Sequence, residues 1–163
     1  MKPEKVIAGK YVLIVDDEQD ILDTLVEYLD MCRLDTASSF GEAKKLLEDN
    51  DYDIAVLDIM GVNGYELLKI ASSRNIPAVM LTGHALSSDN LKRSAEEGAA
   101  YYAPKDKTDE IAAFLADVFE AIDEGISPWE KLLFRLDGYF NKKFHGTDWR
   151  KKVEKYTKTR GYF

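Results

Sequence analysis

The chain has 163 residues, of which 45% are hydrophobic, and it carries a formal net charge of −8. This length and composition predict one domain with a real core and a short appendage, and they exclude a disordered chain. No apolar stretch approaches the roughly 20 residues that a membrane helix needs, and the start lacks the apolar core of a signal peptide. Cys32 is the only cysteine and His84 and His145 are the only histidines, which excludes an internal disulfide and argues against a zinc site. Together these features favour a cytoplasmic protein without a membrane partner.

The charge is unevenly distributed along the chain. Residues 1–126 hold 12 basic and 26 acidic side chains, whereas residues 127–163 hold 10 basic and 4 acidic ones. The net charges of the two parts are therefore −14 and +6. An acidic body argues against broad nucleic-acid binding by its surface, and the basic end is a separate feature.

Five short apolar runs alternate with five helical patterns along the chain. The predicted strands are residues 11–15, 33–37, 54–57, 76–81 and 100–103. The predicted helices cover residues 21–29, 40–47, 65–71, 87–98 and 111–122, of which the fourth is polar and only weakly periodic. Alternation with short connections predicts a parallel sheet with right-handed crossovers and helices on both faces. The expected fold class is therefore α/β, a doubly wound sheet of five strands.

Polar side chains stand where four of the predicted strands end. They are Asp16 and Asp17 after the first strand, Asp58 at the end of the third, Thr82 after the fourth and Lys105 after the fifth. In a parallel sheet these positions gather at one edge, and open α/β sheets bind their ligands there. Each residue taken singly has an ordinary explanation as a helix cap, a turn residue or a solvated lysine. Five such residues at strand ends point instead to a site.

The chemistry of this set suits phosphoryl transfer. Three carboxylates placed together repel one another and raise at least one pKa, unless a divalent cation lies between them. Mg²⁺ takes one or two carboxylates together with waters and phosphate oxygens. An aspartate can attack phosphorus to form an aspartyl phosphate, while the cation and a fixed lysine neutralise charge on the equatorial oxygens. The set is therefore complete for taking a phosphoryl group onto Asp58, with the Thr82 hydroxyl donating to a further oxygen. The chain contains no glycine-rich nucleotide-binding motif.

At this point the sequence resembles a known family, the receiver domain of two-component response regulators. The matching motifs are LIVDDEQDIL, AVLDIM with the later NGYELL, VMLTGHA and EGAAYYAPK, within residues 10–124. The resemblance implies a flavodoxin-like sheet with strand order 2-1-3-4-5. It also implies that Asp58 is the phosphoacceptor and that a histidine kinase or a histidine phosphotransfer protein supplies the phosphoryl group.

The resemblance assigns a role to each of the other residues. It implies that Mg²⁺ is held by Asp16, Asp17 and Asp58 with the backbone carbonyl of Met60. Thr82 becomes the switch hydroxyl and Lys105 the phosphate-binding lysine. Tyr102 matches the aromatic switch position of the family, and its side chain would swing between outward and inward rotamers as Thr82 moves.

The chain departs from the family pattern beside the site. The loop over residues 58–64 is shorter than usual and lacks a proline, so phosphate lifetime and kinase docking are expected to be atypical. Asp106 follows Lys105, where the family often has a proline. His84 lies where the family tunes the access of water to the phosphate, although an exposed loop histidine is the more ordinary interpretation.

A basic, aromatic extension is expected after the receiver-like part, with boundaries 1–124 and 125–163. Pro128 suits the first position of a new helix, and apolar residues recur at helical spacing from Trp129 to Phe144, before a second helical pattern that starts at Trp149. So large an apolar stripe must be covered. Packing on its own domain or in a homodimer ranks first, docking to a partner protein second and nucleic-acid binding third.

Three functions are compared. The first is a phosphorylation-controlled signalling module that acts on an unidentified protein, and it is no enzyme beyond self-phosphorylation from small donors and self-dephosphorylation. The segment after residue 124 is too short for a helix-turn-helix output domain. The second is a phosphatase of the haloacid dehalogenase class, which needs a D-x-D motif after the first strand and a cap insertion, whereas this chain has Asp16-Asp17-Glu18 there and no insertion. The third is a constitutive scaffold with a vestigial acidic site, which the shortened loop keeps open.

Overall fold

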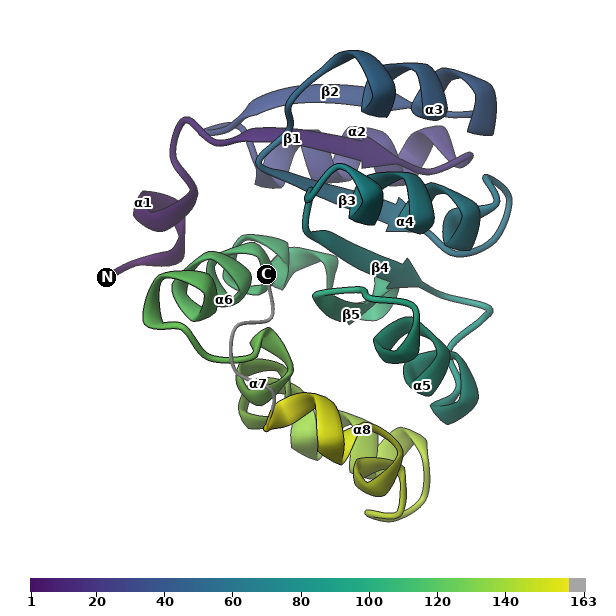
Figure 1. Ribbon diagram of the computed structural model, residues 1–163, viewed down its shortest axis with the longest axis vertical. Helices are drawn as coiled ribbons and strands as arrows, with labels where there is room; N and C mark the ends of the chain where they lie inside the picture. The colour runs from purple at the N-terminus through teal and green to yellow at the C-terminus, as the bar shows by residue number, and fades with distance from the viewer. Residues whose placement is uncertain (159–163) are drawn as a thin grey trace.

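The computed structural model describes residues 1–158 and shows a five-stranded sheet with helices on both faces (Figure 1). The strands are β1 (Tyr11–Val15), β2 (Arg33–Ala37), β3 (Ile54–Asp58), β4 (Ala78–Thr82) and β5 (Tyr101–Pro104). All neighbouring strands are parallel, and their order is β2-β1-β3-β4-β5. The predicted fold class and strand order are therefore confirmed. Every residue of β3 and β4 is buried, as expected for strands covered on both faces.

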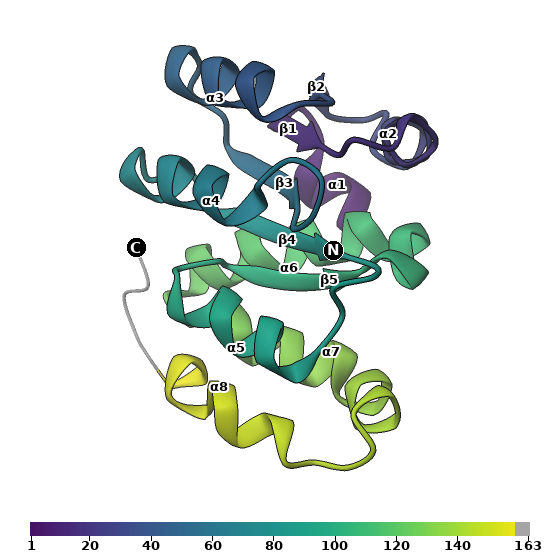
Figure 2. The same cartoon turned by 90° about the vertical axis from the view of Figure 1, so that its right-hand side faces the viewer.

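The helices divide between the two faces of the sheet, as Figure 2 shows. One face carries α3 (Phe40–Asp49), α4 (Gly64–Ser73) and α5 (Ser88–Glu96), and the other carries α2 (Gln19–Tyr28) and α6 (Ile111–Glu124). Local chemistry fixes several helix ends. The Ser39 and Ser87 side chains accept backbone N–H groups in the first turns of α3 and α5, and Gly125 ends α6 in the left-handed conformation. None of the described helices is long and apolar enough to cross a membrane.

Two short elements were not predicted. Helix α1 (Pro3–Ile7) has a proline at its start and packs its buried Ile7 against the core beside α6. The 3-10 turn η1 (Lys105–Glu110) connects β5 to α6 and has no buried residue. Both segments are too short to show a helical period, so the periodicity on which the prediction relied could not reveal them.

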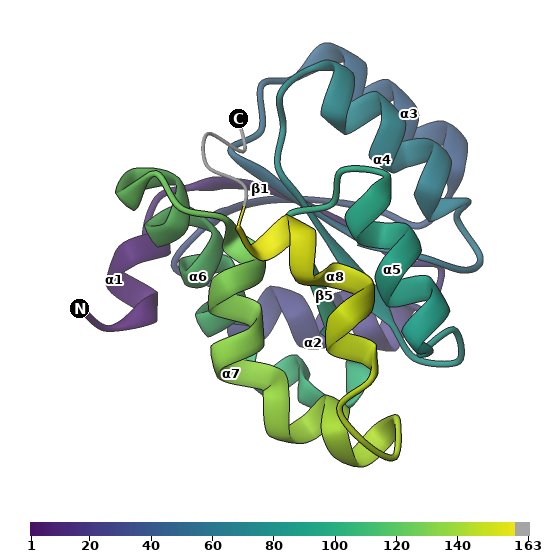
Figure 3. The same ribbon diagram turned by 60° about the horizontal axis from the view of Figure 1, so that its bottom comes forward.

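The C-terminal extension forms two helices, α7 (Pro128–Lys143) and α8 (Trp149–Thr157), that cover the β5 edge of the sheet (Figure 3). Helix α7 packs on α6 and β5, and α8 packs on α7 and α5. The apolar stripe that the sequence predicted is buried in these contacts, through Trp129, Leu132, Leu136 and Phe140 of α7 and Trp149 and Val153 of α8. The extension therefore packs on its own domain, as ranked first. The last part of the predicted extension, residues 159–163, lies outside the described residues.

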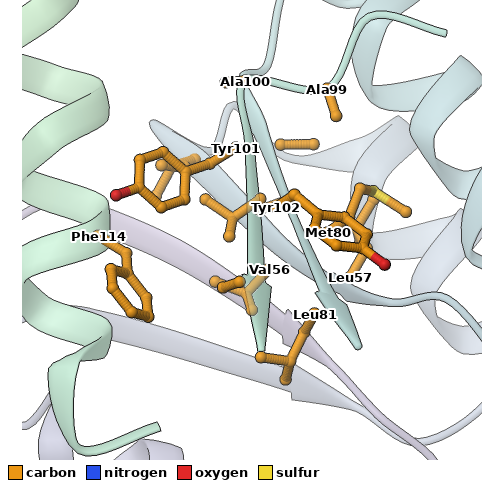
Figure 4. Packing of buried hydrophobic residues seen from close by; sticks show 14 of the residues in the cluster. Val56, Leu57, Met80, Leu81, Ala99, Ala100, Tyr101, Tyr102 and Phe114 are labelled. Atoms are coloured by element: carbon orange, nitrogen blue, oxygen red, sulfur yellow. The ribbon is translucent and has the colours of Figure 1, made fainter. Parts of the chain in front are cut away.

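Two adjacent tyrosines of β5 point to opposite faces of the sheet (Figure 4). Tyr101 stacks on Phe114 of α6, with 5.4 Å between the ring centroids. Tyr102 lies on the other face, beside Met80 of β4. Both tyrosines are fully buried, and their alternation is the ordinary period of a strand. The register of β5 thus decides which tyrosine faces α5.

Candidate functional site

The polar residues predicted from the strand ends meet at the carboxyl edge of the sheet. Asp58 is the last residue of β3 and Thr82 the last of β4, while Asp16 and Lys105 directly follow β1 and β5. The register pairs Asp58 with Leu81, so neighbouring strands end nearly in step. Because the strands are parallel, these four side chains are delivered to one place.

Lys105 is the centre of this cluster. Its Nζ lies 2.9 Å from Oδ2 of Asp16, 3.1 Å from Oδ1 of Asp58 and 3.7 Å from Oε1 of Glu18. Asp16 is fully buried, and the side chains of Asp58 and Lys105 are only 6% and 15% exposed. Burial alone would lower the pKa of Lys105, but the adjacent Asp16 and Asp58 carboxylates raise it above its usual value. The lysine therefore stays charged.

One ammonium does not neutralise the carboxylates around it. Burial, followed by the nearby charge of Asp16, raises the pKa of Asp58 to about 7, although Lys105 acts in the opposite direction. Burial also raises the pKa of Asp16, and a hydrogen bond from the backbone N–H of Glu18 partly offsets this effect. A buried carboxylate with a raised pKa favours the binding of a proton or of a further cation.

The acidic side chains fit a magnesium ion. Carboxylate oxygens of Asp16, Asp17 and Glu18 lie within 4.8 Å of one another. Oδ2 of Asp16 is buried, and the charged group beside it is the Lys105 ammonium, 2.9 Å away. Hard oxygen atoms of this kind are the ligands that Mg²⁺ prefers. Glu18 was not predicted as a site residue, although it continues the acidic run after β1.

The shortened loop after β3 lies close against this cluster. Gly61 has a left-handed φ of 86°, and a Cβ atom at this position would collide with the Asp17 carboxylate. A Cβ atom on Gly64 would collide with the backbone carbonyl of Asp58. Both glycines are therefore needed for the close approach of the loop. A hollow opens beside it, and its lining includes Asp17, Asp58, Met60, Thr82, His84 and Lys105.

Thr82 contributes a buried hydroxyl to the site. The residue is 1% exposed, and its Oγ1 atom has no hydrogen-bond partner within residues 1–158. A buried hydroxyl without a partner costs roughly 1–3 kcal/mol. A ligand that supplied an acceptor oxygen beside Asp58 would recover part of this cost.

Comparison with known proteins agrees with this geometry. The family model of the response regulator receiver domain matches residues 12–116. The chain belongs to the response regulator receiver family. Among curated proteins, the receiver is 41% identical over 87 residues to the response regulator SaeR of Staphylococcus aureus strain USA300. The alignment covers 50% of this chain and 38% of that relative, so the chain spans well under half the length of the curated relatives it matches.

Solved receiver structures have the same fold. The CheY-like response regulator receiver domain protein from Methanospirillum hungatei JF-1 has 30% sequence identity and a TM-score of 0.62, covering 72% of this chain and 99% of that one. The Francisella response regulator 1452 receiver domain has 26% identity and a TM-score of 0.63, covering 70% of this chain and 99% of that one. The receiver family and its fold are therefore shown for this protein.

Tyr102, the predicted aromatic switch residue of this receiver, touches the loop that starts at Thr82. Its hydroxyl accepts the backbone N–H of Ser87 at 3.2 Å and lies 3.3 Å from the carbonyl oxygens of Ala85 and Ser87. Burial raises the pKa of Tyr102 to about 12, so the hydroxyl keeps its proton. The side chain is thus held against the β4–α5 loop, and its swing between rotamers stays a prediction. His84 lines the hollow, and its effect on dephosphorylation also stays a prediction.

Proposed function

We propose that this receiver accepts a phosphoryl group on Asp58 and signals to a partner protein through a conformational switch. The observation that carries the proposal is the position of Asp58. It is a buried carboxylate with a pKa of about 7, located 3.1 Å from the Lys105 ammonium at the rim of an open hollow. An aspartate with a purely structural role does not need an open hollow beside it. A phosphoacceptor needs access for the phosphoryl donor and a fixed positive charge next to the carboxylate.

Asp16, Asp17 and Asp58, with the backbone carbonyl of Met60, would hold Mg²⁺, and Glu18 adds a further carboxylate beside them. When bound, the ion would neutralise the carboxylates and draw charge from the phosphoryl oxygens. The clustered oxygens of Asp16, Asp17 and Glu18, together with the raised pKa of Asp58 that Lys105 does not offset, favour this assignment.

The transfer itself requires little from the protein beyond positioning. A carboxylate oxygen of Asp58 attacks phosphorus of a phosphohistidine, which a histidine kinase or a histidine phosphotransfer protein presents. The new O–P bond forms as the P–N bond breaks, and the leaving imidazole takes up a proton from water. Lys105, already beside Asp58, pairs with a phosphoryl oxygen, and Thr82 donates its free hydroxyl to another. The chain acts as an acceptor and has no separate substrate.

Movement of Thr82 toward the phosphoryl group would displace the β4–α5 loop that Tyr102 contacts. The states with and without phosphate would then differ at the face formed by α5 and β5, and a partner that prefers one state would shift the population toward it.

The test is phosphorylation from a small donor. The protein is incubated with acetyl phosphate and Mg²⁺ and its intact mass is followed over time. We expect a gain of one phosphoryl group, no gain for Asp58→Asn, and a normal gain for Asp20→Asn, which removes an exposed carboxylate in the first turn of α2. An equal gain in Asp58→Asn, or none in the wild type, would contradict the proposal.

A further inference from the structure

The face formed by α5 and β5 is covered by the C-terminal helices of the same chain. Helix α7 lies on β5, and α8 lies between α7 and α5 (Figure 3). Tyr102 of β5 and Phe140 of α7 are both fully buried by this arrangement. In this structure the face is therefore closed.

Aromatic contacts connect Tyr102 to α8. The ring of Tyr102 lies 6.0 Å from that of Phe140, measured between centroids. Phe140 in turn makes an edge contact with Trp149 of α8 at 5.3 Å and stacks on Phe144 at 5.3 Å. The Trp149 indole N–H donates to the side-chain oxygen of Asn141 at 2.8 Å. Helix α8 thus rests on the same cluster that covers the switch tyrosine.

A polar contact ties α8 to the beginning of α5. Lys152 Nζ donates to the Ser88 hydroxyl at 2.8 Å and to the Asp89 carboxylate at 2.9 Å. Ser88 and Asp89 are the first residues of α5, and Ser87 before them is the residue that Tyr102 contacts. Both Tyr102 and α8 therefore bind one short segment, residues 87–89.

The same segment is connected to the candidate site through Thr82. It is joined to Thr82 by four loop residues, 83–86, and the Thr82 hydroxyl makes no hydrogen bond of good geometry inside the described part of the chain. A phosphoryl group on Asp58 would supply that partner and draw Thr82 toward it. The loop is short, so its displacement reaches residues 87–89, where Tyr102 and Lys152 are bound.

We propose that the face formed by β5 and α5 is an interaction surface whose occupant is the α7–α8 segment of the same chain, and that a phosphoryl group on Asp58 loosens α8 from it. The inference rests on the proposed function of Asp58. Coupling between two sites is reciprocal. The factor by which a bound phosphoryl mimic weakens the docking of α8 therefore equals the factor by which release of α8 strengthens the binding of the mimic.

The first measurement is hydrogen–deuterium exchange of the full chain with and without beryllofluoride and Mg²⁺. We expect exchange of the α8 amides to accelerate by about tenfold or more, because α8 opens locally while the rest stays folded. The first part of α7, whose Trp129 and Leu132 side chains are buried, should keep its protection. Asp58→Asn should show no response to the mimic.

The second measurement is the affinity for beryllofluoride, titrated by calorimetry in the presence of Mg²⁺. Lys152→Ala should bind the mimic roughly two- to fivefold more tightly, a range that matches one largely exposed ion pair. Lys151→Ala, an exposed lysine on the same helix, is the matched control and should bind like the wild type. The double variant Lys152→Asp/Asp89→Lys restores opposite charges and should return toward the wild-type affinity.

The outcomes separate the two proposals. If the wild type binds the mimic, yet α8 exchange is unchanged or slower and Lys152→Ala binds no more tightly, this inference is overturned and the role of Asp58 stands. If neither the mimic nor acetyl phosphate modifies the wild type, the proposed function fails and this inference fails with it.

Discussion

Lys105 and Asp58 form a buried ion pair, with 3.1 Å between the ammonium nitrogen and the carboxylate oxygen, although they belong to the ends of different strands. Asp16 shares the same ammonium at 2.9 Å. Two buried carboxylates therefore compete for one cation, and burial, followed by the negative charge of Asp16, raises the pKa of Asp58 to about 7. The same excess makes the site receptive to a divalent ion.

Replacement of Lys105 tests its part in phosphoryl transfer. Lys105→Gln removes the positive charge that faces the developing charge on the phosphoryl oxygens, and we expect Asp58 to be phosphorylated by acetyl phosphate roughly 10²–10³ times more slowly. The time course of intact mass measures this rate. Lys107→Gln, in the same η1 turn, is the control. Equal rates for Lys105→Gln and the wild type would remove Lys105 from the mechanism.

The raised pKa of Asp58 predicts a pH dependence of stability in the absence of metal. In the unfolded chain this carboxyl has its ordinary pKa of 3.8, whereas in the folded chain its pKa is about 7. Between these values the folded state binds more protons, so the contribution of this group to the free energy of unfolding falls as the pH rises from about 4 to about 7.

The variant Asp58→Asn removes this group and should reverse the effect. In EDTA at pH 8 we expect the variant to be more stable than the wild type by about 2–4 kcal/mol, and at pH 5 the difference should be much smaller. Urea denaturation at the two pH values measures both quantities. Stability curves that stay parallel for the two proteins from pH 5 to pH 8 would contradict the raised pKa.

The close approach of the β3–α4 loop predicts that Gly64 cannot be replaced. A Cβ atom at this position would collide with the Asp58 carbonyl, which is backbone and cannot rotate away. We expect Gly64→Ala to lower the free energy of unfolding by about 3 kcal/mol or more. Gly138→Ala, inside α7 with no atom within 4 Å of the added methyl, should instead raise it by about 0.5–1 kcal/mol. Comparable effects of both substitutions would refute the steric explanation.

A second, partly buried ion pair connects α7 to the domain. Arg135 of α7 donates to both carboxylate oxygens of Asp117 at 2.7 and 3.0 Å, and the Tyr101 hydroxyl donates to Asp117 at 2.7 Å. Arg135→Met would leave the buried Asp117 carboxylate with the tyrosine alone. We expect a loss of about 2–3 kcal/mol in urea denaturation, below the value for a fully buried pair, because the Arg135 side chain is about one-third exposed.

The matched control is Lys131→Met, which breaks the pair between Lys131 of α7 and the Glu124 side chain of α6, which is 51% exposed. This change should alter the free energy of unfolding by about 0.5 kcal/mol or less. If Arg135→Met were equally mild, Asp117 would have to be satisfied without the arginine.

Much of the fold and the gathering of the site could be predicted from the sequence because both follow from period and polarity. Each buried strand reads as an apolar run, and the polar residue that ends it marks the edge where parallel strands converge. Asp58, Thr82 and Lys105 were found in this way, and the structure brings them together. Glu18, the third carboxylate of the acidic run, was not selected, because the pattern of strands and helices does not show which of several adjacent acidic residues point into the site.

The destination of the extension could not be predicted as securely, since hydrophobic burial has no direction. The apolar stripe through Trp129 and Phe140 had to be buried, and the chain's own domain, a second copy or a partner protein could each have buried it. Only the structure shows that the cover is β5 and α6 for α7, and α5 for α8. The pair of Lys152 with Asp89 joins residues far apart in the chain, and no local pattern announces it.

The contact between Lys152 and Asp89 has an evolutionary consequence. In a receiver without a helix in the place of α8, no intramolecular ion pair constrains the charge of the residue at the start of α5. In descendants of this chain the two positions constrain each other, so an acidic residue lost from one should be accompanied by a basic residue lost from the other. Lineages that shed α8 should show that constraint disappear.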